Sequence, residues 1–506
     1  MRLTISGLAC CTALALALAG AAQARLELGV TEDAGKADGG AAFFASLTDI
    51  GLTANRVSIP WDVANPNAIH SQAEIEAWLP QAQAAHTRII FAVSPLDARG
   101  MTSSPAAVPQ FAAFVRRLAQ TFPTVKDYVI GNEPNQPRFW LPQFDPAGKG
   151  LSAAAYLPFL AESYDALKAI DPAITVIGIG LSPRGNDMPN ASSNASRSPV
   201  RFLRDLGAAY RASKRTKPLM DELAFHPYPS TSRDSVTTGY VWPNAGMPNL
   251  DRIKQAVWDA FHGTAQTPFA EPGKTYVKPL LFDLDEVGWQ VGILPALASL
   301  YSGVENGPTT DEATQAQIYG DLIKQAACDP TVRLLNFFHL TDELDLKTWQ
   351  SGLMRADGSR RPSYDAVKAM IALTHGNCQA PSKAWSHTTG VVSAFASWGR
   401  MGKPRKTTRA RWSFLTRAGE EATFRAGIFK AGPAKAVLGR RLAVGRPKPV
   451  LAAAGKIKAK GRVVYFPIRR LKPGRYVYAI RMVSTMNPQR VTVFSSKTFR
   501  VGSRRR

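Results

Sequence analysis

The sequence has few cysteines and none of the common metal or dinucleotide motifs. Four of its 506 residues are cysteine, none in a CxxC pair, and its seven histidines include no HExxH pairing. These absences argue against a zinc site. No GxGxxG follows the first strand-like run, which disfavours a dinucleotide fold. The sequence therefore predicts neither a catalytic metal nor a cofactor.

Four acidic residues in predicted loops are candidates for a cation site. Asp187, Asp342, Glu343 and Asp345 lie in predicted loops, but they lack the spacing of a calcium-binding loop. We expect them to be solvated surface acids.

No run of about 18 apolar residues predicts a membrane span, and the first 24 residues are typical of a secretory signal peptide. Arg2 precedes an apolar run, Leu8 to Ala19, that is too short to cross a bilayer, and residues 22–24 read Ala-Gln-Ala. A lipoprotein signal would place a cysteine after this run, whereas Cys10 and Cys11 lie near its start. We expect cleavage after residue 24 and a secreted, extracellular protein.

Removal of that peptide leaves two cysteines, Cys328 and Cys378. In an exported protein an even pair is a disulfide candidate. The bridge would enclose the last β/α unit of the fold. Two free buried thiols are the alternative, because sequence does not give their distance.

Negative charge is almost absent from the C-terminal quarter. Residues 381–506 contain 30 Lys and Arg but only Glu420 and Glu421 as acids, a net charge of +28, while residues 1–380 carry −4. Such a segment attracts anionic polymers whatever their identity. The chain therefore divides into a slightly acidic body and a strongly basic module.

The body alternates strand-like and helix-like segments. The strand-like runs are short and rich in Val, Ile, Leu and Phe without polar alternation, which is typical of parallel strands buried on both faces. They are Leu26–Thr31, Asn55–Ile59, Arg88–Ser94, Lys126–Gly131, Thr175–Leu181, Glu222–His226, Pro279–Leu284 and Arg333–His339.

Amphipathic stretches lie between these runs. They are Ala73–Ala85, Pro105–Thr121, Ala153–Ile170, Pro199–Ala212, Leu250–His262, Glu312–Ala327 and Ser363–Leu373. Eight β/α units in series predict an α/β fold, a closed (β/α)₈ barrel over residues 25–378. An open doubly wound sheet is the alternative.

The pattern changes after a predicted linker, residues 379–391. Residues 392–506 are expected to form a small β-sandwich, and Gly432–Gly461, rich in Ala, Lys and Gly, is expected to be a loop. The predicted strands are Thr407–Leu415, Glu421–Phe429, Arg462–Ile468, Arg475–Met482 and Val491–Val501.

Two glutamates follow strands at the face where barrel enzymes carry their chemistry. Glu133 follows the fourth strand and Glu286 follows the seventh. Retaining hydrolysis of a glycosidic bond needs two carboxyl groups about 5–5.5 Å apart, one as acid/base and one as nucleophile. Strands four and seven lie across a barrel from each other. Asp285 is the alternative to Glu286, because strand register is uncertain by one residue.

Together, Asn132-Glu133-Pro134 and Glu286-Val287-Gly288-Trp289 resemble the motifs of clan A glycoside hydrolases over residues 26–375. The resemblance implies a (β/α)₈ hydrolase in which Glu133 is the acid/base and Glu286 the nucleophile.

The same resemblance gives roles to four further residues. It implies that Arg56 keeps the nucleophile ionised, that His226 and Tyr228 lie near the nucleophile, and that Asn132 binds the sugar 2-hydroxyl. Clan members often carry a tryptophan at the end of strand eight as a sugar platform. This sequence has Phe338-His339 there.

Two tryptophans are candidates for that platform, Trp289 and Trp349, although core packing is the alternative for either. The function predicted is therefore a secreted retaining glycoside hydrolase with a carbohydrate substrate. The alternatives are a non-catalytic carbohydrate- or envelope-binding protein and a transglycosylase. The basic module is expected either to bind an anionic cell-envelope polymer or to be a solubilising surface. It has no recognisable nucleic-acid motif.

Overall fold

The computed structural model describes the body almost continuously and the basic module in segments. The described residues are 25–305, 307–382, 384–388, 405–406, 411–416, 420–430, 449–457, 462–467, 471–485, 491–496 and 498–502. The predicted signal peptide and most of the segment 389–410 lie outside this set.

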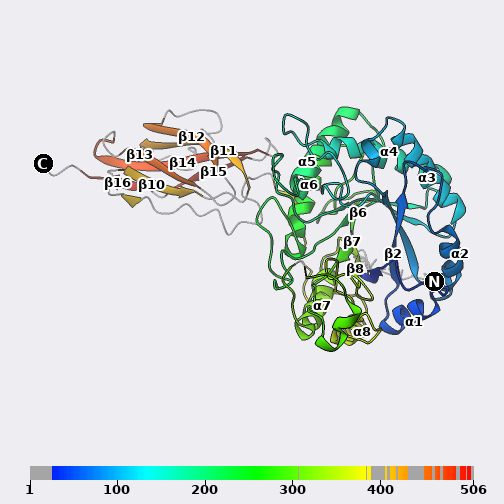
Figure 1. Ribbon diagram of the computed structural model, residues 1–506. Coiled ribbons are helices and arrows are strands. Elements are labelled where there is room, and N and C mark those ends of the chain that lie inside the picture. The colour runs from blue at the N-terminus through cyan, green and yellow to red at the C-terminus, as the bar shows by residue number, and fades with distance from the viewer. Residues whose placement is uncertain are drawn as a thin grey trace, which may run out of the picture.

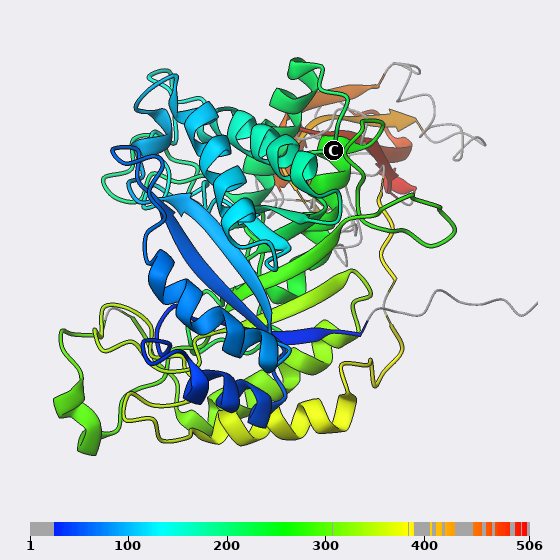
Figure 2. The same ribbon diagram turned by 90° about the vertical axis from the view of Figure 1, so that its right-hand side faces the viewer.

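Eight parallel strands form a closed barrel, in which β8 pairs with β1 (Figures 1 and 2). This confirms the predicted (β/α)₈ fold. Most strand residues are buried on both faces, as their apolar runs predicted. The strands are β1 (Glu27–Thr31), β2 (Ala54–Trp61), β3 (Arg88–Pro95), β4 (Asp127–Ile130), β5 (Thr175–Leu181), β6 (Glu222–Phe225), β7 (Leu281–Val287) and β8 (Val332–Phe338).

Eight α-helices surround the barrel. In α3 the buried residues Phe111, Phe114, Val115 and Leu118 are spaced to form one apolar stripe that faces the strands. The helices are α1 (Ala41–Ile50), α2 (Gln72–Ala84), α3 (Ala107–Thr121), α4 (Ser152–Ile170), α5 (Pro199–Ser213), α6 (Leu250–Phe261), α7 (Glu312–Ala327) and α8 (Pro362–Thr374). Of these, α1 is missing from the predicted helices.

Strand β7 contains an irregularity at its C-terminal end. Its pairing with β8 runs from Leu284 opposite Leu335 to Val287 opposite Phe337, so β7 has one more residue than β8 over this interval. A bulge of this kind breaks the strict alternation of side chains. The two acids inside the bulge, Asp285 and Glu286, therefore both reach the mouth of the barrel.

The basic module is the predicted antiparallel β-sandwich. Its core includes Phe414 of one sheet stacked on Tyr478 of the other, with ring centroids 4.0 Å apart. One sheet contains β9 (Arg405–Lys406), β10 (Arg411–Thr416) and β13 (Arg462–Pro467). The other contains β11 (Ala422–Lys430), β12 (Leu451–Ile457), β14 (Gly474–Ser484), β15 (Val491–Ser495) and β16 (Phe499–Val501).

The expectation of a loop over Gly432–Gly461 is wrong in part. Leu451–Ile457 forms β12, which pairs along β11 from Leu451 opposite Ile428 to Ile457 opposite Ala422. Its sequence, LAAAGKI, has little intrinsic strand propensity. The tertiary pairing with β11 therefore determines its conformation.

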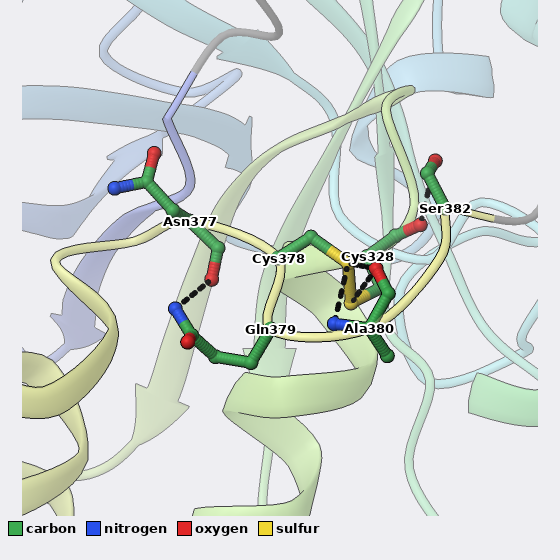
Figure 3. The surroundings of a disulfide bond; sticks show 6 residues. All are labelled: Cys328, Asn377, Cys378, Gln379, Ala380 and Ser382. Carbon is green, nitrogen blue, oxygen red and sulfur yellow. Dashed lines mark hydrogen bonds between the residues drawn. A yellow bond between two sulfur atoms is a disulfide. The ribbon is translucent and has the colours of Figure 1, made fainter.

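The two cysteines of the body form a disulfide bond (Figure 3). Cys328 caps the C-terminus of α7, and Cys378 follows α8, so the bridge encloses β8 and α8. Ser382 donates a 3.2 Å hydrogen bond to the carbonyl of Cys328. The bridge therefore ties the last β/α unit to the rest of the barrel.

The chain remains packed against the barrel after the disulfide. Trp385, inside the predicted linker, is 6% exposed and joins the barrel core. The ring of His387 stacks on Trp258 of α6 at 3.9 Å, and its Nδ1 lies 2.6 Å from Glu271. The sandwich lies beside α5 and α6 (Figure 1), where Arg201 Nη2 is 3.0 Å from Glu421 Oε2.

Among the described residues, no helix combines the length and the apolar composition needed to cross a bilayer.

Candidate active site

Glu133 lies just beyond β4 in a strained backbone conformation. Its φ angle is +40°, in the left-handed region that side chains other than glycine rarely adopt. Its amide donates a 2.7 Å hydrogen bond to the carbonyl of Gly180, which holds this turn against β5. Strain of this kind costs about 1–3 kcal/mol and is concentrated at functional sites.

Glu133 and Glu286 share one neighbour, His226. The Nδ1 atom of His226 lies 3.0 Å from Glu133 Oε1 and 3.4 Å from Glu286 Oε2. The side chain of Glu133 is 15% exposed and that of Glu286 10%, while His226 is fully buried. The two carboxylates therefore meet over a single gap at the mouth of the barrel.

Arg56 of β2 connects the nucleophile candidate to its surroundings. Its Nη1 lies 2.9 Å from Glu286 Oε1, and its Nε lies 2.9 Å from Asp285 Oδ2. Its third nitrogen, Nη2, donates a 2.9 Å hydrogen bond to Asn132 Oδ1. One guanidinium therefore orients both acids of β7 and the asparagine beside Glu133.

Tyr228 and Trp349 complete this side of the gap. The hydroxyl of Tyr228 donates a 3.1 Å hydrogen bond to Glu286 Oε2. The half-buried ring of Trp349 lies 4.6 Å from the Tyr228 ring and 6.0 Å from Phe338, the last residue of β8. The structure thus brings Trp349 from its loop to the end of strand eight, where clan A members often carry a tryptophan.

Asp285 is fully buried and makes structural contacts. His226 Nε2 lies 3.3 Å from its Oδ1, and Thr31 donates a hydrogen bond to its carbonyl. Burial opposes ionisation of the Asp285 carboxyl, but the nearby His226 and Arg56 hold its pKa below the ordinary value. Asp285 therefore contributes fixed negative charge beneath the gap.

The charge on His226 follows from its neighbours. Burial alone would lower the pKa of its imidazole, but Glu286 and Asp285 raise that pKa to about 10. The ring is therefore cationic near neutral pH and has a proton on each nitrogen to donate. Burial, and then the charge of Glu286, raise the pKa of Tyr228 above its ordinary value, so its hydroxyl remains a donor.

The structure corrects the expectation that Trp289 is a sugar platform. Its side chain is 1% exposed, and its Nε1 donates a 2.8 Å hydrogen bond to the carbonyl of Asp234. The ring packs edge-on against Tyr319 in the barrel core. A ring with no open face cannot stack on a sugar, so Trp289 has a packing role.

The loop acids are mainly held in ion pairs. Asp342 is 6% exposed, which corrects its expected solvation, and Arg361 contacts both its oxygens at 2.5 and 2.6 Å. Asp187 lies 3.1 Å from both Arg197 and Arg201. Within the described ranges, no group of three or more His, Cys, Asp or Glu side chains is arranged to hold a metal ion.

Sequence reasoning missed a second polar group beside Trp349. Glu343 Oε2 accepts a 2.8 Å hydrogen bond from the Trp349 amide and lies 3.7 Å from His339 Nε2. His339 Nδ1 is 2.6 Å from the carbonyl of Thr31. This group, His339 and Glu343, links the Trp349 loop to β1. In the sequence, the position of His339 at the end of a predicted strand was the only indication of this polar group.

Comparisons with known proteins complete the description of this site. No family model and no curated protein sequence matches the chain. Among solved structures, it is similar to a family 39 glycoside hydrolase from Bacteroides cellulosilyticus WH2, at 15% identity and TM-score 0.46, over 88% of this chain and 80% of that one.

It is also similar to GH5_18 from Streptomyces cattleya in complex with GlcNAc, at 16% identity and TM-score 0.46, over 73% of this chain and 84% of that one. A GH10 endoxylanase from a sugarcane soil metagenome matches at 11% identity and TM-score 0.41, over 68% of this chain and 96% of that one. All three of these solved structures are glycoside hydrolases.

Proposed function

We propose that the chain is an exported glycoside hydrolase that cleaves O-glycosyl bonds with retention of configuration. The observation that carries this proposal is the contact of both Glu133 and Glu286 with Nδ1 of His226, at 3.0 and 3.4 Å. The two oxygens cannot be farther apart than the sum of these contacts. A retaining pair is about 5–5.5 Å apart and an inverting pair about 6.5–9.5 Å, so this upper limit accommodates a retaining pair and reaches only the lower edge of the inverting range.

In the first step, a carboxylate oxygen of Glu286 attacks the anomeric carbon, and the bond from that carbon to the leaving oxygen breaks. Glu133 gives its proton to the leaving oxygen. Arg56 at 2.9 Å and the Tyr228 hydroxyl at 3.1 Å orient Glu286 for this attack. The products are a glycosyl ester of Glu286 and the released alcohol.

In the second step, water attacks the same anomeric carbon from the face that the leaving group vacated. Glu133, now ionised, takes a proton from this water, and the ester bond to Glu286 breaks. The sugar leaves with its original configuration and both acids return to their starting states. Asn132, held by Arg56 at 2.9 Å, is positioned to bind the sugar 2-hydroxyl as positive charge develops on the ring.

Glu286 is preferred to Asp285 as the nucleophile because of their surroundings. Asp285 is fully buried between Arg56 and His226. Glu286 retains 10% side-chain exposure and is the β7 acid that lies near Glu133. The longer side chain is therefore the one that can meet a substrate.

Export rests on two features. The first is the signal-like sequence over residues 1–24, and the second is the bridge between Cys328 and Cys378. Disulfides persist mainly in oxidising compartments. Both features support a protein that acts outside the cytoplasm.

The test is turnover and rescue. Wild-type protein is screened against a panel of aryl glycosides, and Glu286→Ala is assayed on any substrate that is cleaved, with and without sodium azide. We expect the variant to be inactive alone and to form the glycosyl azide of inverted anomeric configuration, detected by proton NMR. Full activity of Glu286→Ala would refute the assignment.

The same panel separates the two alternatives. Binding of glycans without turnover of any substrate would indicate a non-catalytic carbohydrate-binding protein. Transfer products that dominate over hydrolysis at high acceptor concentration would indicate a transglycosylase, which uses the same residues.

A further inference from the structure

Arginines face each other directly across two strand pairs of the basic module. Arg425 of β11 lies opposite Arg481 of β14, and Arg475 of β14 lies opposite Arg500 of β16. Like charges directly opposite on antiparallel strands are destabilising. Two such pairs in one sheet therefore lower the stability of the fold, and this suggests that the arginines have a function.

Both pairs lie on the outer face of the sheet. Tyr476, Tyr478, Ile480 and Met482 of β14 point into the sandwich core. The odd-numbered residues of β14 consequently lie on the opposite face of the sheet, where the two paired arginines flank the buried Val477 and Ala479. Arg481 lies six positions after Arg475, which places the pairs about 20 Å apart along the strand.

Three of the four arginines are exposed to solvent, and an exposed lysine lies near one of the pairs. Arg425, Arg475 and Arg500 are exposed, and Arg481 is half-buried with an Nε that has no hydrogen-bond partner. Lys456 of β12 is exposed on the same face, diagonal to Arg425, because it pairs with Thr423. We name this set of four arginines and Lys456 the cationic face.

Each of the two acids of the module contacts a residue other than the paired arginines. Glu421 contacts Arg201 of the barrel at 3.0 Å. Glu420 is 4% exposed and accepts a hydrogen bond from Ser484. These are the only two acids in residues 381–506, so the module has far fewer carboxylates than arginines and lysines.

We infer that the cationic face binds an anionic polysaccharide, with each arginine pair holding a carboxylate or similar oxyanion of the polymer. Guanidinium groups bind such anions through paired hydrogen bonds. Two anchor points on one chain raise its affinity well above that of a single unit. The contact between Glu421 and Arg201 at the start of α5 attaches this face to the barrel.

A polysaccharide is favoured over a nucleic acid for two reasons. Single-stranded nucleic acids are held by exposed aromatic rings, and Phe429, the aromatic residue of β11 on the outer face, is 2% exposed. The second reason rests on the proposed function, since a hydrolase of glycosidic bonds gains from holding the polymer it cleaves.

The test uses the full chain and measures dissociation constants for polygalacturonate by calorimetry at about 50–200 mM NaCl. Two double variants, Arg425→Gln with Arg481→Gln and Arg475→Gln with Arg500→Gln, each remove one pair. The matched control is Arg116→Gln with Arg117→Gln, which removes two exposed charges from α3 of the barrel. Duplex DNA, galacturonic acid monomer and neutral dextran are comparison ligands.

We expect each pair variant to weaken polygalacturonate binding about tenfold or more, while the control shifts it less than about twofold. The monomer and dextran should bind much more weakly than the polymer. Equal losses in all three variants would mean that net charge alone binds the polymer, and this would overturn the inference. Tighter binding of DNA than of polygalacturonate would overturn it as well.

The binding assay requires no turnover, so its result is independent of catalysis. The pair variants should cleave small aryl glycosides at the wild-type rate. Arginine-dependent binding in a protein that cleaves no glycoside would refute the proposed hydrolase and still support the cationic face as a polyanion site.

Discussion

The Nδ1 atom of His226 lies 3.0 Å from Oε1 of Glu133. The same ring faces Asp285 through Nε2 at 3.3 Å, so each ring nitrogen lies near a carboxylate. This explains why the neighbouring acids favour the cationic ring.

Replacing His226 should change stability in a pH-dependent way. The folded pKa of about 10 lies above the ordinary value of 6.5, so the charged ring stabilises the fold fully below pH 6.5, and this stabilisation is lost as the pH rises through 10. The melting-temperature gap between wild type and His226→Gln, measured from pH 6 to 10, should shrink with rising pH. A gap that stays constant would show that the ring is not charged in the folded protein.

Glu133→Gln should affect substrates according to their leaving groups. A general acid contributes about 10²–10⁴-fold when the leaving oxygen needs a proton. We expect a loss of that size in kcat/KM for an alkyl or sugar leaving group and a much smaller loss in kcat/KM for a dinitrophenyl glycoside, because kcat/KM reports the first step. The control is Glu162→Gln, at an exposed acid of α4, which should behave as wild type with both substrates.

Arg56→Lys should lower kcat/KM by about 100-fold, because an ammonium cannot reproduce three contacts that point in different directions. Arg56 reaches Asp285, Glu286 and Asn132, each at 2.9 Å. Arg56→Met should also destabilise the fold by about 3–5 kcal/mol, since it removes one of the two cations beside the buried Asp285. Unchanged denaturant unfolding of Arg56→Met would contradict this reading.

Trp349→Ala should raise KM roughly tenfold, in line with the loss of a contact of about 1.4 kcal/mol. Glu343→Ala should reproduce much of this effect, since Glu343 accepts the Trp349 amide proton at 2.8 Å. Glu343→Gln keeps an acceptor oxygen and should restore KM.

The matched control for this series is the buried tryptophan. Trp289→Ala should lower the free energy of unfolding by about 3–5 kcal/mol. Trp289→Phe should have a lower melting temperature than wild type and an unchanged KM. A rise in KM for Trp289→Phe without a change in melting temperature would restore the platform role that the structure argues against.

Much of this architecture could be predicted from the pattern of residues. The eight apolar runs stand out because parallel strands are buried on both faces. α1 is different, because Gly40 and Gly51 bound it in left-handed conformations with φ of +77° and +91°, and no polar cap or acidic first turn marks its start. It is held by burial of Phe43, Phe44 and Leu47 against the barrel.

Site residues could be predicted from the sequence where their place at the end of a strand determines where they lie. They could not be predicted where contacts with distant segments determine their burial. Glu133, Glu286, Arg56, His226 and Tyr228 all come together, because strand ends in a barrel converge. The burial of Trp289 depends on Tyr319 and on the carbonyl of Asp234. These partners come from other parts of the chain, so local sequence gives no sign of them.

Removing the disulfide should weaken the barrel. The bridge between Cys328 and Cys378 spans 50 residues, and closing a loop of that length is worth up to about 4 kcal/mol in the chain-entropy model. Cys328→Ser with Cys378→Ser should therefore lower the melting temperature, and reduction of the wild type should do the same. An unchanged melting temperature would show that packing alone holds β8 and α8.

The extra residue in β7 constrains how the length of this strand can evolve. A deletion of one residue between Leu284 and Val287 would restore regular alternation. Because Asp285 and Glu286 are the two residues in this interval, the deletion would remove either the buried charge or the carboxylate at the gap. Insertions and deletions should therefore be far less tolerated here than at other strand ends. The Asp285-Glu286 dipeptide should consequently occupy the same alignment position in diverged sequences.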